Sequence, residues 1–191
     1  MKLDRGGGVT VFCGSTDIGQ GSNTVLATIV AEEFSIDPEQ VIVVTADTDL
    51  TPVDLGSYSS RVTLMTGNAA IEACRPLKEK LLSAVAEVFQ CTSESLTLSE
   101  GRVVSLRDTS KTVDFAEAVQ WAEAKFGTLG SVGSYTPPRR GGKFKGAGVG
   151  PSPNYSYSAC VAEVECDPET GIYQVHKLWL AHDVGRSINP V

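Results

Sequence analysis

The sequence predicts an α+β fold in which a mixed sheet carries packed helices. Three observations support this class: two β-rich runs flank a helix near the N-terminus, a long helical stretch follows, and two hairpin patterns lie on either side of a third helix. Because strands and helices do not alternate steadily, a regular α/β fold is less consistent with the order of elements.

The first elements predict a strand, a helix and a second strand. Residues 9–13 are β-rich and follow three consecutive glycines, and residues 41–45 form the second β-rich run. Residues 22–34 between them have an apolar stripe at helical spacing. We therefore expect a right-handed crossover that joins two parallel strands. The stripe consists of Val25, Leu26, Ile29, Val30 and Phe34.

The middle of the chain predicts a long helix, a hairpin and a shorter helix. Pro76 lies inside the helical stretch at residues 60–89, so we expect a kink or break near Cys74. Residues 96–106 form a hairpin pattern that turns at residues 99–101. The third helix is predicted to begin at Asp114 with a capping box to Glu117 and to end at Gly127. Its expected buried stripe is Phe115, Ala118, Val119, Ala122 and Phe126.

A loop rich in Gly, Pro and Ser at residues 134–156 precedes the last hairpin, expected at residues 159–180. We interpret its basic side chains as part of a lid or subunit contact. They are Arg139, Arg140, Lys143 and Lys145. With no convincing linker, residues 1–191 are predicted to be a single partial domain, truncated at both ends.

The composition excludes several classes of partner. The chain has 191 residues, 41% of them hydrophobic, and a formal net charge of −7, which disfavours a nucleic-acid partner. No apolar run approaches the roughly 20 residues that span a membrane, and no signal-peptide pattern is present, so we expect a cytoplasmic protein. Five irregularly spaced cysteines and two histidines predict neither a zinc nor an iron-sulfur site, and we assign no metal ligand.

The first candidate site is the Gly-rich segment at residues 13–22, which joins a strand to a helix. Glycines allow positive φ angles and close approach of a ligand, and a helix start presents free N–H groups. Gly19-Gln20-Gly21-Ser22 is therefore a possible anion site, although neither a P-loop nor the G-x-G-x-x-G pattern is present. The alternative is a plain turn in which Ser22 caps the helix.

The second candidate site is a similar helix start in the run Leu55-Gly56-Ser57-Tyr58-Ser59-Ser60-Arg61, which Val62-Thr63 and then Gly67-Asn68 follow. The alternative is that a serine caps the helix and Arg61 lies in solvent. Two helix starts of this kind, each entered from a strand, favour a shared ligand. The acids of the loop before it match no known magnesium or calcium loop and are interpreted as solvated. They are Asp47, Asp49 and Asp54.

At these loops the chain resembles the molybdenum hydroxylases, the family of xanthine dehydrogenase and aldehyde oxidase. Residues 17–24 resemble the family's G-Q-G segment, and residues 47–69 resemble its second cofactor loop and the helix that follows. The amino-acid sequence of residues 54–61 is most similar to that of the large subunit of 4-hydroxybenzoyl-CoA reductase. The segments 183–185 and 188–190 resemble another family segment, so the resemblance covers nearly the whole chain.

The resemblance implies a molybdopterin cofactor, possibly in its cytosine dinucleotide form. Gln20 and Gly21 would contact the pterin, and the second loop would approach the pterin and phosphate from the other side. The cofactor contacts implied or predicted in this way are Gly19, Gln20, Gly21, Ser22, Ser59, Ser60, Arg61 and Val62.

The resemblance also implies what this chain lacks. The family's Gly-Phe-Gly-Gly loop and its general-base glutamate have no counterpart here, so we assign no catalytic residue and expect the chain alone to be inactive. Iron-sulfur clusters and FAD are expected in partner subunits only. The implied reaction is reductive dehydroxylation of an aromatic CoA thioester or hydroxylation of an aldehyde or N-heterocycle. For a CoA thioester, the resemblance gives the basic loop an alternative role, in which residues 139–145 contact the CoA phosphates. The alternative is a non-catalytic binding or assembly module that retains the fold.

Overall fold

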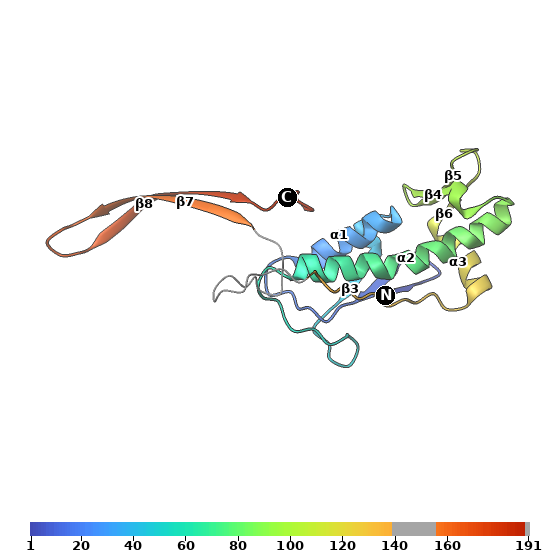
Figure 1. Cartoon of the computed structure of the whole chain (residues 1–191), viewed down its shortest axis with the longest axis horizontal. Helices are drawn as coiled ribbons and strands as arrows, with labels where there is room; N and C mark the ends of the chain where they lie inside the picture. The colour runs from blue at the N-terminus through green and yellow to red at the C-terminus, as the bar shows by residue number, and fades with distance from the viewer. Residues whose placement is uncertain (139–155, 190–191) are drawn as a thin grey trace. The chain divides into compact units, whose positions relative to one another are not determined.

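The structure, a computed structural model, describes residues 1–138 and 156–189 (Figure 1). The basic residues Arg139, Arg140, Lys143 and Lys145 lie outside this described part. Contacts divide the chain into two compact units, Met1–Pro153 and Asn154–Val191, and the prediction of one partial domain stays a prediction. The mixture of helices and small sheets confirms the α+β class. None of the described helices is long and apolar enough to cross a membrane.

The first unit begins with a three-stranded mixed sheet in the order β1-β2-β3. The strand β1 is antiparallel to β2, whereas β2 is parallel to β3, with Val9 opposite Val41. Alternate residues of β2, Val9 and Val11, are buried, as expected for a strand with one face on the core. The strands are β1 (Lys2–Leu3), β2 (Val9–Phe12) and β3 (Val41–Val44).

The helix α1 (Ser22–Phe34) connects β2 to β3 and packs against β3, which confirms the predicted order and the parallel pairing. Its C-cap is Ser35, which has a left-handed backbone conformation with φ of 53°. A short 3-10 helix, Pro38–Gln40, then leads into β3 and is capped by the side chain of Asp37.

The helix α2 (Val62–Phe89) lies side by side with α1 (Figure 1). It runs through Pro76 without a break, so that part of the prediction is wrong, whereas the alternative of a kink stays a prediction. Leu77 and Leu81 are fully buried just after the proline, so core packing holds the helix together despite the lost N–H. The helix begins two residues later than predicted because Ser59 and Ser60 have positive φ angles.

A second sheet has the order β4-β5-β6 and is antiparallel throughout. Its first two strands confirm the predicted hairpin, which turns at Glu100 and Gly101; a 3-10 helix, Ser93–Ser95, precedes it, and the third strand was not predicted. The helix α3 follows at once and ends at Gly127 as predicted. These elements are β4 (Leu96–Ser99), β5 (Arg102–Ser105), β6 (Thr112–Asp114) and α3 (Phe115–Phe126).

Two predicted details of α3 are wrong. Asp114 stands at the N-cap but makes no capping hydrogen bond with its side chain. Its carboxylate instead pairs with the Arg102 guanidinium at 3.0 Å, across β5 and β6, so the ion pair competes with the cap. Phe126 is 40% exposed rather than buried, because the last turn of α3 extends past the core.

One apolar core joins both sheets and the three helices of this unit, and its buried residues lie between Leu3 and Leu129. Phe34 at the end of α1 meets Phe115 at the start of α3, with ring centroids 5.6 Å apart. The C-terminus of β2 and the N-terminus of α2 therefore belong to packed elements. The first candidate loop follows β2 and the second precedes α2, so both are anchored to this core.

The second unit contains an antiparallel hairpin of β7 (Tyr157–Cys166) and β8 (Tyr173–Asp183). It confirms the predicted hairpin and its turn, where the Gly171 amide donates to the Asp167 carbonyl oxygen. The register shifts by one residue between Glu163 and Val164, which marks a β-bulge.

Candidate functional site

The first candidate loop connects β2 to α1 and contains two glycines with positive φ angles. Gly19 has φ of 101°, and Gly21, the N-cap of α1, has φ of 75°. These values favour glycine, as the sequence predicted. A Cβ added at either glycine would meet no atom within 4 Å, so the backbone of both faces open space.

The amides at this helix start already hold an anion of the chain itself, the Asp17 carboxylate. Oδ1 accepts from the Gly19 and Gly21 amides at 2.9 and 3.4 Å, and Oδ2 accepts from the Asn23 amide at 3.1 Å. The hydrogen bonds from Asn23 and then Gly19 lower the pKa of Asp17 below its ordinary value, so the group is charged at neutral pH. These three amides therefore already bind a carboxylate of the chain, and whether Gly19, Gln20, Gly21 and Ser22 contact a cofactor stays a prediction.

The alternative for this loop, a helix capped by Ser22, is also wrong, since Ser22 is buried and makes no capping bond. The Ser22 hydroxyl accepts from Gln20 Nε2 at 3.1 Å, and the same Nε2 donates to the Thr16 carbonyl at 3.2 Å. Gln20 Oε1 accepts from the Ile18 amide at 2.6 Å. The exposed Gln20 side chain is thus held in one orientation on its own loop.

The second candidate loop ends at Arg61, the N-cap of α2. Ser59 and Ser60 have φ angles of 55° and 51°, are exposed, and neither caps the helix with its side chain. Within the described residues no acceptor binds the amides of the first three helical residues, Val62, Thr63 and Leu64. This helix start, unlike that of α1, presents free N–H groups.

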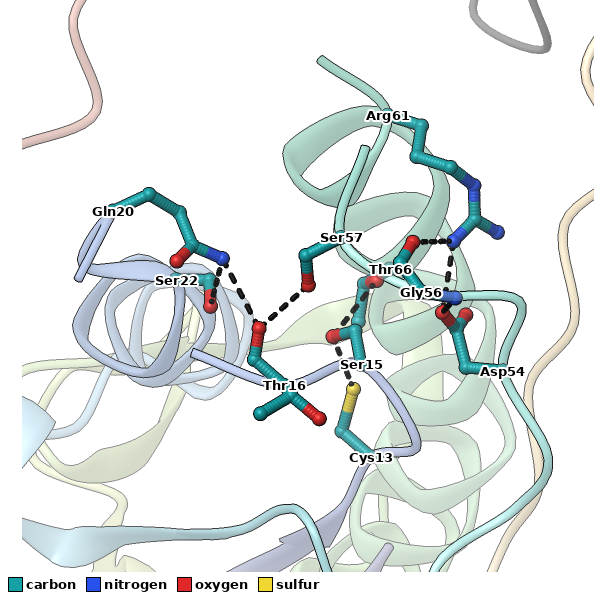
Figure 2. Close-up of polar contacts among 10 residues, drawn as sticks. All are labelled: Cys13, Ser15, Thr16, Gln20, Ser22, Asp54, Gly56, Ser57, Arg61 and Thr66. Atoms are coloured by element: carbon teal, nitrogen blue, oxygen red, sulfur yellow. Dashed lines mark hydrogen bonds and ion pairs between the residues drawn. The ribbon is translucent and has the colours of Figure 1, made fainter. Parts of the chain in front are cut away.

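Arg61 is buried rather than solvated, with 6% of its surface exposed. Its Nη1 donates to Asp54 Oδ1 and to the Gly56 carbonyl, both at 2.8 Å (Figure 2). The guanidinium carbon lies 5.6 Å from the centre of the Tyr58 ring. Asp54 is therefore not a solvated acid as predicted, because its carboxylate is paired with the buried Arg61 guanidinium. This ion pair holds the second loop in its conformation.

The structure brings the two loops together. Ser57 Oγ donates to the Thr16 carbonyl oxygen at 2.5 Å, and that oxygen also accepts from Gln20 (Figure 2). Gly14 touches the second loop so closely that an added Cβ would overlap the Pro52 carbonyl oxygen. The expectation that both segments form one site is consistent with these contacts.

A chain of polar side chains also ties the first loop to α2. Cys13 Sγ and Ser15 Oγ are 3.0 Å apart, and Thr66 Oγ1 of α2 lies 3.5 Å from Ser15 Oγ (Figure 2). Ser15 is only 2% exposed. The start of the first loop is therefore fixed on the second helix as well as on the second loop.

A cavity of about 820 Å³ opens between the end of β2, the second loop, α2 and residues 131–135. Of the eight predicted cofactor contacts, only Arg61 lines it. Its wall combines apolar side chains with the Asp54–Arg61 pair and Asp49. Cavities of this size suit a small molecule or a chain segment. Within the described residues no three His, Cys, Asp or Glu side chains form a set that could hold a metal ion.

The two candidate segments included Gly14, Thr16, Asp17 and Ser57, but sequence reasoning assigned no role to these four residues, which shape the site from inside. One local signal was available. An Asp two residues before a Gly is typical of an Asx-turn, and both Asp17 and Asp54 accept from the amide of the glycine that follows. Whether the eight predicted residues contact a cofactor stays a prediction.

Comparison with known proteins identifies the family. A family model described as "Molybdopterin cofactor-binding domain" matches residues 1–191. The whole chain is 32% identical to the 6-hydroxypseudooxynicotine dehydrogenase complex subunit gamma of Paenarthrobacter nicotinovorans and covers 23% of it. It is 31% identical to the probable hypoxanthine oxidase XdhD of Escherichia coli (strain K12) and covers 18% of that protein.

The fold agrees with these matches. In the crystal structure of a Cu,Mo-CO dehydrogenase, 23% of one chain superposes on 99% of this chain with a TM-score of 0.81 and 25% identity. The chain spans less than a quarter of the length of these relatives. It belongs to the molybdopterin cofactor-binding domain family of the molybdenum hydroxylase-type oxidoreductases.

Proposed function

We propose that the chain forms one wall of the molybdenum cofactor site in the large subunit of a molybdenum hydroxylase-type oxidoreductase. The observation that carries the proposal is the Ser57–Thr16 hydrogen bond, which makes one surface from the loops that begin α1 and α2. One loop offers the exposed amide of Gln20, and the other offers backbone N–H groups at a helix start. A ligand with a hydrogen-bonding ring and an anionic group matches these two loops. Molybdopterin has both parts.

The free amides at the start of α2 fit the anionic part of this cofactor. Val62, Thr63 and Leu64 have N–H groups without an acceptor in residues 1–138 and 156–189. They lie at the positive end of the helix dipole, beside the exposed hydroxyls of Ser59 and Ser60. We assign the phosphate to these groups. Arg61 would act indirectly, because its guanidinium is bonded to Asp54 and holds the loop in shape.

The Gln20 loop fits the ring part. Gln20 is exposed and its amide is already oriented by three hydrogen bonds, so binding would order few further torsions. The backbone of Gly19 and Gly21 faces open space, which leaves room for a flat ring to approach. Ser22 would support Gln20 rather than touch the ligand. When bound, the cofactor would supply the oxidation-reduction chemistry, while this chain positions it.

The proposed reaction is hydroxylation of an aromatic N-heterocycle. It is supported by relatives whose names include a nicotine 6-hydroxylase large subunit of Paenarthrobacter nicotinovorans and a probable hypoxanthine oxidase. The resemblance of residues 54–61 to the large subunit of 4-hydroxybenzoyl-CoA reductase favours a second reaction, the reductive dehydroxylation of an aromatic CoA thioester. Some relatives are named as one subunit of a complex, so we propose iron-sulfur and flavin subunits as partners. The cytosine dinucleotide form of the pterin is proposed with them.

Molybdenum and pterin analysis of the purified complex that contains this chain tests the proposal. We expect about one molybdenum and one pterin per large subunit. In the variant Ser60→Asp, a negative charge at the start of α2 should repel the phosphate and lower both contents, whereas the stability of the helix should not fall. Thr128→Asp adds the same charge at an exposed site outside the two loops and should leave both contents unchanged.

The cofactor content and the substrates of the complex distinguish the proposed reactions from the alternative. A folded complex without molybdenum or pterin would favour the alternative, a non-catalytic module. If cofactor is present, turnover of nicotine or hypoxanthine by the complex supports the first reaction. Reduction of 4-hydroxybenzoyl-CoA without turnover of either heterocycle supports the second.

A further inference from the structure

The two helix starts of the site differ in charge. At α1 the Asp17 carboxylate uses both oxygens to accept from the amides of Gly19, Gly21 and Asn23. These are the N–H groups that an anionic ligand would otherwise bind. The chain therefore supplies its own anion at this position.

The start of α2 has the opposite character. Its first three amides, Val62 to Leu64, have no acceptor among the described residues. The acid of the same loop, Asp54, is paired with the Arg61 guanidinium at 2.8 Å, so its charge is compensated. Among the residues that the structure describes, the Asp17 carboxylate at α1 has no cationic partner, whereas Asp54 is paired with Arg61.

We propose that Asp17 is a positioning and specificity-determining residue that excludes anionic groups from the start of α1 and directs them to α2. It fixes the Gln20 loop through three amides, and its charge leaves that loop to a neutral, hydrogen-bonding part of the ligand. The inference rests on the proposed function for the identity of the ligand. It adds the residue that enforces this division of the site, because the charge of Asp17 keeps anionic groups away from the Gln20 loop.

Inorganic phosphate is a suitable probe, because it tests charge preference without the cofactor. Backbone amide NMR of the full 191-residue chain should show phosphate-induced shifts at Val62, Thr63 and Leu64 and none at the amides held by Asp17. Asp17→Asn retains a side-chain oxygen that accepts hydrogen bonds but removes the charge. In this variant phosphate should also shift the α1 amides, and its dissociation constant there should be at least about fivefold below the lower limit that the wild-type titration sets, as expected for removal of one charge in water.

Two further variants make the test specific. Asp17→Glu keeps the charge and should retain the wild-type pattern even if the loop geometry changes. Asp108→Asn removes the same charge from an exposed turn outside the site, where Asp108 accepts from Ser110, and should change neither set of amides. A role in loop structure alone would leave the phosphate pattern unchanged in Asp17→Asn.

The inference is overturned if phosphate shifts the α1 amides of the wild-type chain as strongly as those of α2. It is also overturned if Asp17→Asn and the wild type give the same map. Failure of the proposed function is distinct from both, because it would appear as a purified complex without molybdenum or pterin while the phosphate map remains as expected.

Discussion

The hydroxyl of Ser57 donates a hydrogen bond of 2.5 Å to the carbonyl oxygen of Thr16, 41 residues earlier in the chain. The same carbonyl accepts from Gln20 Nε2 at 3.2 Å. One backbone oxygen thus connects the loop that begins α1 with the loop that begins α2. The relative position of the two halves of the proposed cofactor site depends on this junction.

The variant Ser57→Ala should loosen the junction. Loss of one hydrogen bond is expected to lower the free energy of unfolding by about 1 kcal/mol. Molybdenum content of the purified complex should fall more clearly than stability, because the two loops no longer hold a fixed spacing. Urea unfolding and metal analysis measure the two effects. Ser110→Ala, which removes a hydroxyl bonded to Asp108 on an exposed turn, should change neither; equal losses in both variants would contradict this role of Ser57.

The variant Gly14→Ala should force the loops apart. An added Cβ would overlap the Pro52 carbonyl and lie 2.9 Å from Asp54 Cβ, and neither can move without displacing the second loop. We expect a destabilisation of about 1–3 kcal/mol, typical of overpacking, together with loss of cofactor. Gly130→Ala is the matched control, since its nearest neighbour would be the Met1 carbonyl at 3.8 Å. Similar unfolding free energies for the two variants would show that Gly14 is not under steric restriction.

The ion pair between Arg61 and Asp54 should matter far more for stability than exposed pairs of the same chemistry. The variant Asp54→Ala leaves a buried guanidinium with the Gly56 carbonyl alone and should cost about 3 kcal/mol or more. Glu72→Ala breaks the exposed pair with Arg75 in α2 and should change the free energy by less than about 1 kcal/mol. Comparable urea midpoints would contradict a structural role for the buried pair.

The helices and strands of the first unit could be predicted because their signal is local. Alternating valines mark β2, and apolar residues at helical spacing mark α1, whose bounds agree with the prediction. The helix does not break at Pro76, because burial of Leu77 and Leu81 overrides the local tendency of proline to end a helix. Local periodicity does not report such tertiary packing.

The interior of the site could not be predicted in the same way. The glycine positions indicated where both loops lie. Whether the amides at the start of α1 are free to bind a ligand depends on the conformation of Asp17, whose carboxylate accepts hydrogen bonds from them. Arg61 is buried because Asp54 and the Gly56 carbonyl meet it, a contact that depends on the conformation of the intervening loop. Spacing alone does not determine such conformations.

Cysteine reactivity should divide the thiols by burial. Cys74 is completely buried, and burial, followed by the charge of Glu33, raises its pKa to about 12. Cys160 and Cys166 are exposed. Iodoacetamide at pH 8 should therefore modify Cys160 and Cys166 in the native chain and spare Cys74, as mass spectrometry can measure. In guanidinium chloride all five cysteines should react.

The same thiol gives a prediction for alkaline pH. Because the folded-state pKa of Cys74 is raised above the ordinary value of 9.0, the protonated thiol stabilises the fold fully below about pH 9. This contribution is lost as the pH rises from there through the folded pKa. Cys74→Ala should remove that part of the alkaline decrease in stability. Labelling of native Cys74 at the rate of Cys160 would contradict both expectations.

Acid should weaken the Gln20 loop through Asp17. Its pKa is lowered in the folded chain, first by the Asn23 amide, so the charged carboxylate contributes stability above its ordinary value of 3.8. That contribution is lost as the pH falls through the lowered folded-state pKa. The difference in free energy of unfolding between the wild type and Asp17→Asn should be constant from about pH 5 to 7 and should shrink below about pH 4. Carboxyl carbon NMR provides the direct measurement: titration of Asp17 at or above 3.8 would mean that the amides of α1 do not hold its charge.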